Sequence, residues 1–186
     1  MTMQHTLLFS GSGGQGVMFA GQLLAYAGMA EGMHVTWIPS YGPEMRGGTA
    51  HCFVIISDKQ IGSPIVRHPL VAVLFNEPAF QKYEPLIAEG GFLVTNSSLV
   101  MKRSKRTDIT SLYIPASSIA DELGEAKLAN MVMVGAIVAC YPAISLNTIH
   151  QVLGQHVPEH RHHLLALNDK ALDMGDKLGR GALVPN

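Results

Sequence analysis

An apolar run over residues 6–10 opens directly into the glycine-rich segment 11–16, which reads Gly-Ser-Gly-Gly-Gln-Gly. Residues 17–31 then carry apolar side chains at the spacing of a helix with one buried face, and Gly32 suits the end of that helix. A second apolar run, 34–38, follows at once. A strand, a glycine turn, a helix and a second strand in this order predict the first unit of a parallel sheet.

The remaining residues continue the alternation of short apolar runs with helical patterns. The sequence contains no linker, internal repeat or low-complexity tract, so we predict a single domain over residues 1–186. The predicted fold is a three-layer α/β/α domain with a mostly parallel, Rossmann-like sheet. Further strands are predicted at 49–57, 70–75, 92–95 and 111–114, and further helices after the cap Asn76, at 117–123, at 130–139, at 146–153 after the cap Ser145, and from Pro158 to about Leu178.

Two segments contain residues that interrupt regular structure. Residues 39–48 are rich in proline and glycine, and we predict a loop there. Residues 58–60 have the composition of a turn, so 60–66 is predicted to return as a short antiparallel strand. Pro64 would place that strand at a sheet edge.

The chain has a low content of charged residues. Apolar residues make up 47% and charged residues 15% of the sequence, against about 25% charged residues in a typical soluble domain. Such a surface leaves apolar area that a partner protein can cover. A glycine- and alanine-rich α/β protein with a large core would have the same composition, so both explanations stay open.

Charge, hydropathy and cysteine content exclude several function classes. The net charge of −1 provides no strong field for nucleic acid, and the basic run 102–106 is predicted to be an exposed loop. The longest apolar stretch, 131–140, is too short to span a bilayer, and the first residues do not resemble a signal peptide, so we expect a cytoplasmic protein with no membrane partner. Cys52 and Cys140 are far apart, and a cluster is usually held by several thiolates, so no iron–sulfur cluster is expected within the chain.

Gly11, Gly13 and Gly16 fit the GxGxxG pattern of dinucleotide-binding proteins, in which N–H groups at a helix start hold a pyrophosphate. A dinucleotide site also needs an acidic residue at the end of the second strand to hold the ribose. Here that strand ends in the uncharged residues 38–40. A small NAD(P)-binding oxidoreductase, a simple anion site, and glycines that only allow close helix packing remain alternatives.

The glycine segment occurs together with a second distinctive segment, 41–48, which reads Tyr-Gly-Pro-Glu-Met-Arg-Gly-Gly. This pairing resembles the gamma subunit, or gamma domain, of 2-oxoacid:ferredoxin oxidoreductases. The resemblance continues through 75–78, Phe-Asn-Glu-Pro, and through 130–136, Asn-Met-Val-Met-Val-Gly-Ala, and it extends over about three quarters of the chain. Within that family the amino-acid sequence of 41–48 is most similar to that of the 2-oxoglutarate type, ahead of the pyruvate and branched-chain types.

The resemblance implies that the chain is one part of a larger enzyme. Enzymes of this family convert a 2-oxoacid and coenzyme A to an acyl-CoA, carbon dioxide and reduced ferredoxin. The implied partners are alpha and beta subunits, with a delta subunit in some complexes, and these hold thiamine diphosphate, magnesium and iron–sulfur clusters. This chain is expected to bind no cofactor alone and to be inactive alone. A non-catalytic binding module that reuses the fold is a further alternative.

We expect the site residues of this chain to lie in the two glycine-rich segments and to include no catalytic residue and no metal ligand. His156 and His160 have the spacing of a metal pair, but Pro158 between them favours surface or interface histidines. An anion or partner contact is expected at Gly11, Gly13, Gly14, Gln15 and Gly16. A partner interface or coenzyme A path, to which Arg46 and Glu44 would be presented, is expected at Tyr41, Gly42, Pro43, Glu44, Met45, Arg46, Gly47 and Gly48.

Overall fold

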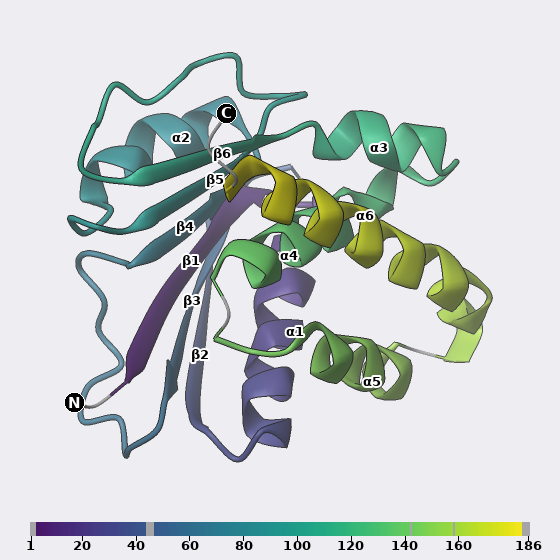
Figure 1. The fold of residues 1–186 in the computed structure, drawn as a ribbon, viewed down its shortest axis with the longest axis horizontal. Coiled ribbons are helices and arrows are strands. Elements are labelled where there is room, and N and C mark those ends of the chain that lie inside the picture. The colour runs from purple at the N-terminus through teal and green to yellow at the C-terminus, as the bar shows by residue number, and fades with distance from the viewer. Residues whose placement is uncertain (1–2, 44–46, 142, 158, 184–186) are drawn as a thin grey trace.

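The computed structural model describes residues 3–43, 47–141, 143–157 and 159–183. Its centre is one six-stranded sheet in the order β2-β3-β1-β4-β5-β6 (Figure 1). The strands are β1 (Gln4–Ser12), β2 (His34–Tyr41), β3 (Thr49–Ser57), β4 (Val71–Leu74), β5 (Phe92–Asn96) and β6 (Thr110–Ile114).

β3 runs against both of its neighbours, whereas β1, β4, β5 and β6 pair in parallel. β2 points the same way as β1 but lies one position further out, because β3 is inserted between them. Antiparallel strands can be joined by a short connection, and β2 and β3 form such a hairpin, with Tyr41 opposite Ala50. The mostly parallel sheet is therefore confirmed, with one reversed strand.

The loop predicted over 39–48 begins later in the structure. β2 continues to Tyr41, and Pro39 lies opposite Cys52 in the hairpin. Proline lacks a backbone N–H and is tolerated in edge strands, and β2 is the outermost strand of the sheet. The prediction of a loop from residue 39 was wrong for this reason.

The antiparallel strand predicted at 60–66 is also wrong. These residues are irregular, and the Ser63 hydroxyl accepts a hydrogen bond from the Ile65 N–H at 3.3 Å. Gly62 and Pro64 both weaken a strand ladder, which explains why the segment does not pair.

Helices cover both faces of the sheet and give the domain the three layers that the sequence predicts (Figure 1). They are α1 (Val17–Ala30), α2 (Glu77–Tyr83), η1 (Glu84–Leu86), α3 (Ala116–Glu122), η2 (Ala126–Leu128), α4 (Ala129–Cys140), α5 (Leu146–His156), η3 (Glu159–Leu164) and α6 (Leu165–Leu183). Successive strand residues point to opposite faces, so Leu7 and Phe9 pack with α1 and α4, whereas Leu8 packs with Phe80 of α2. In the part of the chain that the structure describes, no helix combines the length and apolarity needed to cross a membrane.

Both predicted helix caps are present. The Asn76 side-chain oxygen accepts a hydrogen bond from the Ala79 N–H at 3.0 Å, and the Ser145 hydroxyl accepts from the Thr148 N–H at 3.1 Å. Each cap satisfies a backbone donor that the first helical turn cannot satisfy itself. The Asn76 cap fixes the direction in which the chain leaves β4 and enters α2, next to the glycine turn.

α4 and α6 cross with their backbones in contact. A Cβ atom at Gly135 would collide with the Leu172 carbonyl oxygen, and one at Gly175 would collide with the Val132 carbonyl oxygen. A Cβ atom at Gly179 of α6 would likewise collide with the Ala136 carbonyl oxygen of α4. The glycines therefore allow α6 to lie directly on α4, which brings the start of α6 toward the end of the sheet that carries the glycine turn.

Candidate functional site

The glycine segment 11–16 forms the turn between β1 and α1. The Gly13 N–H donates to the Gly48 carbonyl oxygen at 2.8 Å, so this turn is fastened to the residues that precede β3. Gly14 and Gly16 have φ values of 95° and 73°, a conformation that glycine adopts far more readily than other residues. The structure thus brings together the two glycine-rich segments that the sequence singles out.

Gln15 fills the crevice between the ends of β1 and β4. Its side-chain oxygen accepts from the Ser12 N–H at 2.7 Å and from the Asn76 side-chain amide at 3.3 Å. The same Asn76 amide donates to the Ser12 hydroxyl at 2.7 Å. This crevice is the point at which chain connections turn to opposite sides of the sheet, and such points often bind ligands. Here polar side chains of the protein itself occupy it.

The sheet order also departs from that of a dinucleotide site. In a dinucleotide-binding fold the acid that holds the ribose follows the strand next to β1. The neighbour on this side is the reversed strand β3, and β2 lies two strand spacings, about 10 Å, from β1. The end of β2 therefore lies one strand further from the glycine turn than the ribose-holding strand of a dinucleotide site. The geometry suits an anion site better than a dinucleotide site.

A cavity of about 640 Å³ opens beside the glycine turn. Its wall includes the first turn of α1, Val17 to Phe19, whose N–H groups have no intrahelical carbonyl to donate to. The first bond inside the helix joins the Ala20 N–H to the Gly16 carbonyl oxygen at 3.0 Å. Exposed N–H groups at a helix start attract anions, so this wall can bind a phosphate or carboxylate.

The opposite walls of the cavity come from distant parts of the chain. Lys127 of η2 and Arg161 of η3 both line it. Tyr26 of α1 and His156 of α5 stack there, with ring centroids 3.9 Å apart and planes inclined by 23°. Glu125 lines it too and accepts the Lys127 N–H at 3.2 Å. The cavity thus combines a helix start, two cationic side chains and an aromatic pair.

Asn130, at the start of α4, connects the glycine turn to the cavity wall. Asn130 is 6% exposed, and its side-chain amide donates to the Gly16 carbonyl oxygen at 3.3 Å. A Cβ atom at Gly16 would collide with that amide. The sequence indicated Asn130 only as part of a recurring segment, and the structure gives it a contact.

Most predicted site residues lie at or beside the cavity. Gly13, Gly14 and Gly16 line it directly, and Gln15 fastens the turn. Tyr41 lines it as well and is 69% exposed. The Gly42 N–H donates to the Thr49 carbonyl oxygen at 2.7 Å and closes the hairpin loop that contains Pro43, Gly47 and Gly48. Glu44, Met45 and Arg46 lie outside the described residues.

The residues of the opposite wall are those that sequence reasoning missed. Tyr26, Lys127 and Arg161 belong to no sequence motif. His156 is exposed, as its interpretation as a surface or interface residue implies, but its place in the cavity was not predicted. These residues meet only because η2, α5 and η3 line the same cavity as α1, and no local spacing indicates that arrangement. Positive side chains near a glycine turn would have been the signal, but they lie more than a hundred positions away in the sequence.

The histidines and cysteines have other surroundings. His156 ends α5 whereas His160 lies in η3, so the two do not share a helix. Across residues 3–43, 47–141, 143–157 and 159–183, no group of three His, Cys, Asp or Glu is gathered as a metal site. Cys52 and Cys140 are buried, and burial raises the pKa of each thiol to about 11.

The family described as pyruvate ferredoxin/flavodoxin oxidoreductase matches residues 6–178. The chain belongs to this family. Among curated members of the pyruvate ferredoxin/flavodoxin oxidoreductase family, the ketoisovalerate oxidoreductase subunit VorA of Methanothermobacter marburgensis is 41% identical over 130 residues, which are 70% of this chain and 27% of VorA. The chain therefore spans about a quarter of that relative. The 2-oxoglutarate synthase subunit KorC of Methanocaldococcus jannaschii is 35% identical over 162 residues, 84% of this chain and 86% of KorC.

Solved structures of the family have the same fold. The gamma subunit of a keto/oxoacid ferredoxin oxidoreductase from Geobacter sulfurreducens superposes with a TM-score of 0.81 at 31% identity, over 95% of this chain and 99% of that chain. The 2-oxoglutarate:ferredoxin oxidoreductase of Magnetococcus marinus, with 2-oxoglutarate, coenzyme A and succinyl-CoA bound, gives a TM-score of 0.88 at 25% identity, over 96% of this chain and 31% of that chain.

Proposed function

We propose that this chain is the gamma subunit of a 2-oxoacid:ferredoxin oxidoreductase and that its cavity binds coenzyme A. The match to a whole gamma subunit, over 99% of its length, supports the subunit role. In this proposal alpha and beta subunits, with a delta subunit in some complexes, are the partners. They hold thiamine diphosphate, magnesium and the iron–sulfur clusters, and ferredoxin accepts the electrons.

The observation that carries the coenzyme A assignment is the cavity beside the glycine turn. Coenzyme A presents phosphate groups, an adenine ring and a long, flexible arm. The start of α1 and the side chains of Lys127 and Arg161 suit the phosphates. The stacked pair Tyr26 and His156 suits a planar ring. One cavity therefore offers a complementary group for each polar part of the ligand.

The exposed side of the cavity suits the arm of coenzyme A. Tyr41 lines the cavity and is 69% exposed, so an arm that passes this side chain leaves the domain. The reactive thiol would then meet the 2-oxoacid in a partner subunit, because this chain is not expected to contribute a catalytic group. Holding the phosphates and directing the arm is a positioning role, which lowers the entropic barrier to the reaction.

Calorimetric titration with coenzyme A tests the cavity directly. We expect Lys127→Ala and Arg161→Ala each to weaken binding by about 1–3 kcal/mol, since each removes a charge-assisted contact to phosphate. Lys59→Ala is the matched control, because Lys59 is an exposed cation on the turn after β3 and does not line the cavity. If all three variants bound coenzyme A with equal affinity, coenzyme A would bind at another site.

We propose 2-oxoglutarate as the substrate of the complex. One relative that matches this chain over most of both lengths is a 2-oxoglutarate synthase subunit at 35% identity, whereas the ketoisovalerate relative is more identical over a shorter part of its own length. The assembled enzyme should reduce an acceptor fastest with 2-oxoglutarate, compared with pyruvate and 3-methyl-2-oxobutanoate. The isolated chain should give no turnover with any of them. Turnover by the chain alone would refute the subunit proposal.

Arg46 remains the proposed contact of the 41–48 loop, although it lies outside the described residues. A guanidinium can bind both oxygens of a carboxylate or phosphate. Arg46→Ala should therefore leave the unfolding temperature of the lone chain nearly unchanged and weaken assembly or turnover of the complex, by about 2–5 kcal/mol if the charge is buried at the contact. A sharp drop in unfolding temperature with intact turnover would restrict Arg46 to shaping its own loop.

A further inference from the structure

One wall of the cavity comes from a single stretch of the chain, which runs from the end of α5 through η3 to the start of α6. The lining residues of this stretch are His156, Val157, Arg161, Leu164 and Asn168. In η3, the part that carries Arg161, none of the residues Glu159–Leu164 is buried. Core packing therefore contributes little to holding η3 in the wall.

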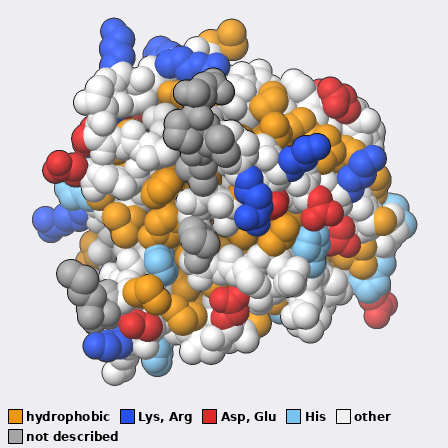
Figure 2. All heavy atoms as spheres, in the orientation of Figure 1, with side chains coloured by type: hydrophobic (Ala, Val, Ile, Leu, Met, Phe, Trp, Pro, Cys, Tyr) orange, Lys and Arg blue, Asp and Glu red, His pale blue; other side chains and the backbone are white. Residues whose placement is uncertain are grey.

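A contact between α5 and α6 joins the two ends of this stretch. The Nδ1 atom of His150 in α5 is 2.5 Å from an Asp169 carboxylate oxygen, and its Nε2 atom is 3.1 Å from one of Asp173. The five lining residues all lie between His150 and Asp169 in the chain, so the contact closes a loop that contains this wall. Figure 2 shows histidine and acidic side chains together on the right-hand side, where Figure 1 places α5 and α6.

The arrangement around His150 suits the charged imidazolium, because both ring nitrogens face a carboxylate. A neutral imidazole has a single N–H group, so its other nitrogen would present a lone pair to a carboxylate oxygen. Asp169 and Asp173 are four positions apart on one face of α6, where like charges repel each other. The charged ring donates to both carboxylates and offsets this repulsion, whereas the neutral ring loses one contact and leaves the repulsion in place.

The other helices that pack against α5 offer His150 no competing charge. α1 and α4 contain no Asp, Glu, Lys or Arg. Of their titratable side chains, Tyr26 stacks on the ring of His156, and the Cys140 thiol donates to a backbone carbonyl oxygen of α4. Glu31, just beyond α1, contacts the cap of α5 instead. Among the described residues, the charged groups that face His150 are therefore the two carboxylates of α6.

We propose that His150 is a proton-dependent latch, whose charged form ties α5 to α6 and keeps Arg161 in the cavity wall, and whose neutral form lets the wall loosen. An imidazole changes its charge near neutral pH, so the latch responds in the range in which cells vary. The side chains of His150, Asp169 and Asp173 are 26%, 45% and 64% exposed, so each ion pair contributes modestly. A modest contribution suits a contact that has to open as well as close. Only the consequence for coenzyme A rests on the proposed function.

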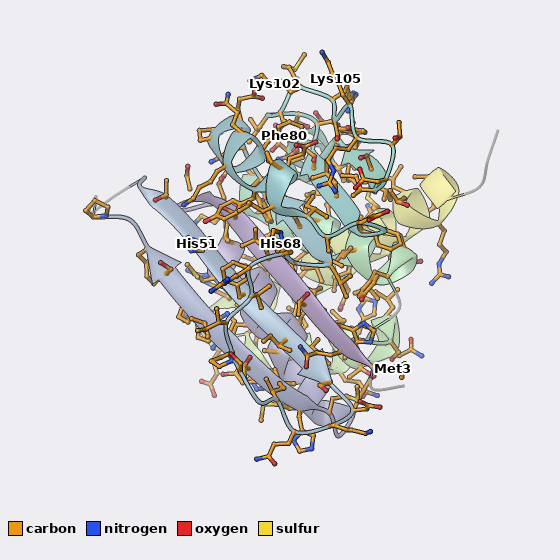
Figure 3. The ribbon with its side chains drawn as sticks, turned by 90° about the vertical axis from the view of Figure 1, so that its left-hand side faces the viewer. Met3, His51, His68, Phe80, Lys102 and Lys105 are labelled. Atoms are coloured by element: carbon orange, nitrogen blue, oxygen red, sulfur yellow. The ribbon has the colours of Figure 1, made fainter. Side chains whose placement is uncertain are left out.

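Other histidines titrate in different parts of the domain. The His51 ring lies 5.6 Å from that of Tyr83 in α2, on the face of the sheet that is turned to the viewer in Figure 3. His68 lies on the same face and contacts the Leu86 carbonyl oxygen. A test of the latch therefore has to report on the wall itself and not on unfolding of the whole domain. Amide hydrogen exchange gives such a local measurement.

The experiment compares amide exchange of the purified chain and its variants, measured by mass spectrometry in peptides from α5 and η3. At pH 6.5, His150→Gln should exchange about threefold faster there than the unmodified chain, because glutamine carries no charge to hold both carboxylates. At pH 9.0 these two chains should exchange equally fast, since the unmodified latch has then lost its proton. His150→Arg keeps its charge and should exchange more slowly than the unmodified chain at pH 9.0. His34→Gln, at an exposed histidine outside this wall, is the matched control and should behave as the unmodified chain does.

Two results would overturn the latch. Equal exchange by His150→Gln and the unmodified chain at pH 6.5 would show that His150 does not hold the wall. A difference that persists at pH 9.0, with no protection by His150→Arg, would mean that the ring acts by packing and not by its charge.

Calorimetric titration of the same variants with coenzyme A separates the latch from the proposed function. At pH 6.5, His150→Gln should bind coenzyme A about two- to threefold more weakly, because Arg161 is then held less firmly in the wall. His34→Gln should bind it as the unmodified chain does. If amide exchange responds as expected but the affinity for coenzyme A does not change, the latch stands and the assignment of coenzyme A to this cavity is wrong.

Discussion

The side-chain amide of Asn130 donates to the backbone carbonyl oxygen of Gly16 at 3.3 Å and joins the start of α4 to the start of α1. The two residues are 114 positions apart in the chain. Gly16 also has a left-handed φ of 73°. The contact fixes the end of α1 that faces the cavity, so the conformation of the glycine turn depends on α4 being in place.

Gly16→Ala should destabilise the fold by more than Gly14→Ala. Both residues have positive φ, which costs other residues about 1–2 kcal/mol. Only at Gly16 would the added Cβ atom also collide with Asn130, because a Cβ atom at Gly14 meets nothing within 4 Å. Urea unfolding of the two variants gives the comparison. The double variant Gly16→Ala/Asn130→Ala should be more stable than additive losses predict, and equal losses at the two glycines would contradict the collision.

Gly135→Ala should destabilise the crossing of α4 and α6 by at least about 2 kcal/mol, since a methyl group cannot fit between two helix backbones without moving them. Gly154→Ala in α5 is the matched control: its Cβ atom would enter open space, and alanine should raise stability by up to about 1 kcal/mol. Thermal unfolding of both variants measures the difference. If Gly135→Ala left the unfolding temperature unchanged, the backbones of α4 and α6 would not be in contact.

The free energy of unfolding should fall as the pH drops below the ordinary histidine pKa of about 6.5. Burial lowers the pKa of His5 and of His51, and Lys82 lowers the pKa of His51 further. The unfolded chain then binds protons at a higher pH than the folded chain does, so unfolding is favoured on acidification. Urea midpoints at pH 7.5 and pH 5.5 should differ by less in His51→Gln than in the unmodified chain. The exposed His34 provides the control substitution, and the same reduction in His34→Gln would remove His51 as the cause.

Neither cysteine should react with a thiol reagent in the native state. Both thiols are buried and have a pKa of about 11, so at pH 8 only about one in a thousand is the reactive thiolate even before access is considered. Ellman's reagent should therefore detect two thiols only after denaturation in guanidinium. Rapid labelling of the folded chain at either position would show that the surrounding core opens easily.

Local patterns predicted the elements that depend on neighbouring residues. The helical spacing of residues 17–31 gave α1, and the side chains of Asn76 and Ser145 indicated helix starts because caps act over three or four residues. The continuous apolar run at 70–75 correctly indicated a central, fully buried strand, β4.

Features that depend on distant contacts were not predictable in the same way. The place of β3 between β1 and β2 results from strand pairing and has no local signature. The stack of Tyr26 on His156 depends on how α5 packs against α1, and the contribution of Arg161 to the cavity depends on the path of η3. The glycine turn could be found from the sequence, but the wall opposite it could not.

The position of β1 in the sheet has a consequence for synthesis of the chain. Of the strands that the structure describes, β1 leaves the ribosome first, and both of its partners come later, since it pairs with β3 up to Ser57 and with β4 from Val71. Both edges of its apolar residues Leu7, Leu8 and Phe9 are therefore unpaired until β3 has been translated, and one edge stays unpaired until β4 follows. An unpaired apolar strand is prone to associate with other chains. We expect the nascent chain to need chaperone protection until β4 emerges, and the local β2–β3 hairpin to form before β1 has a place to bind.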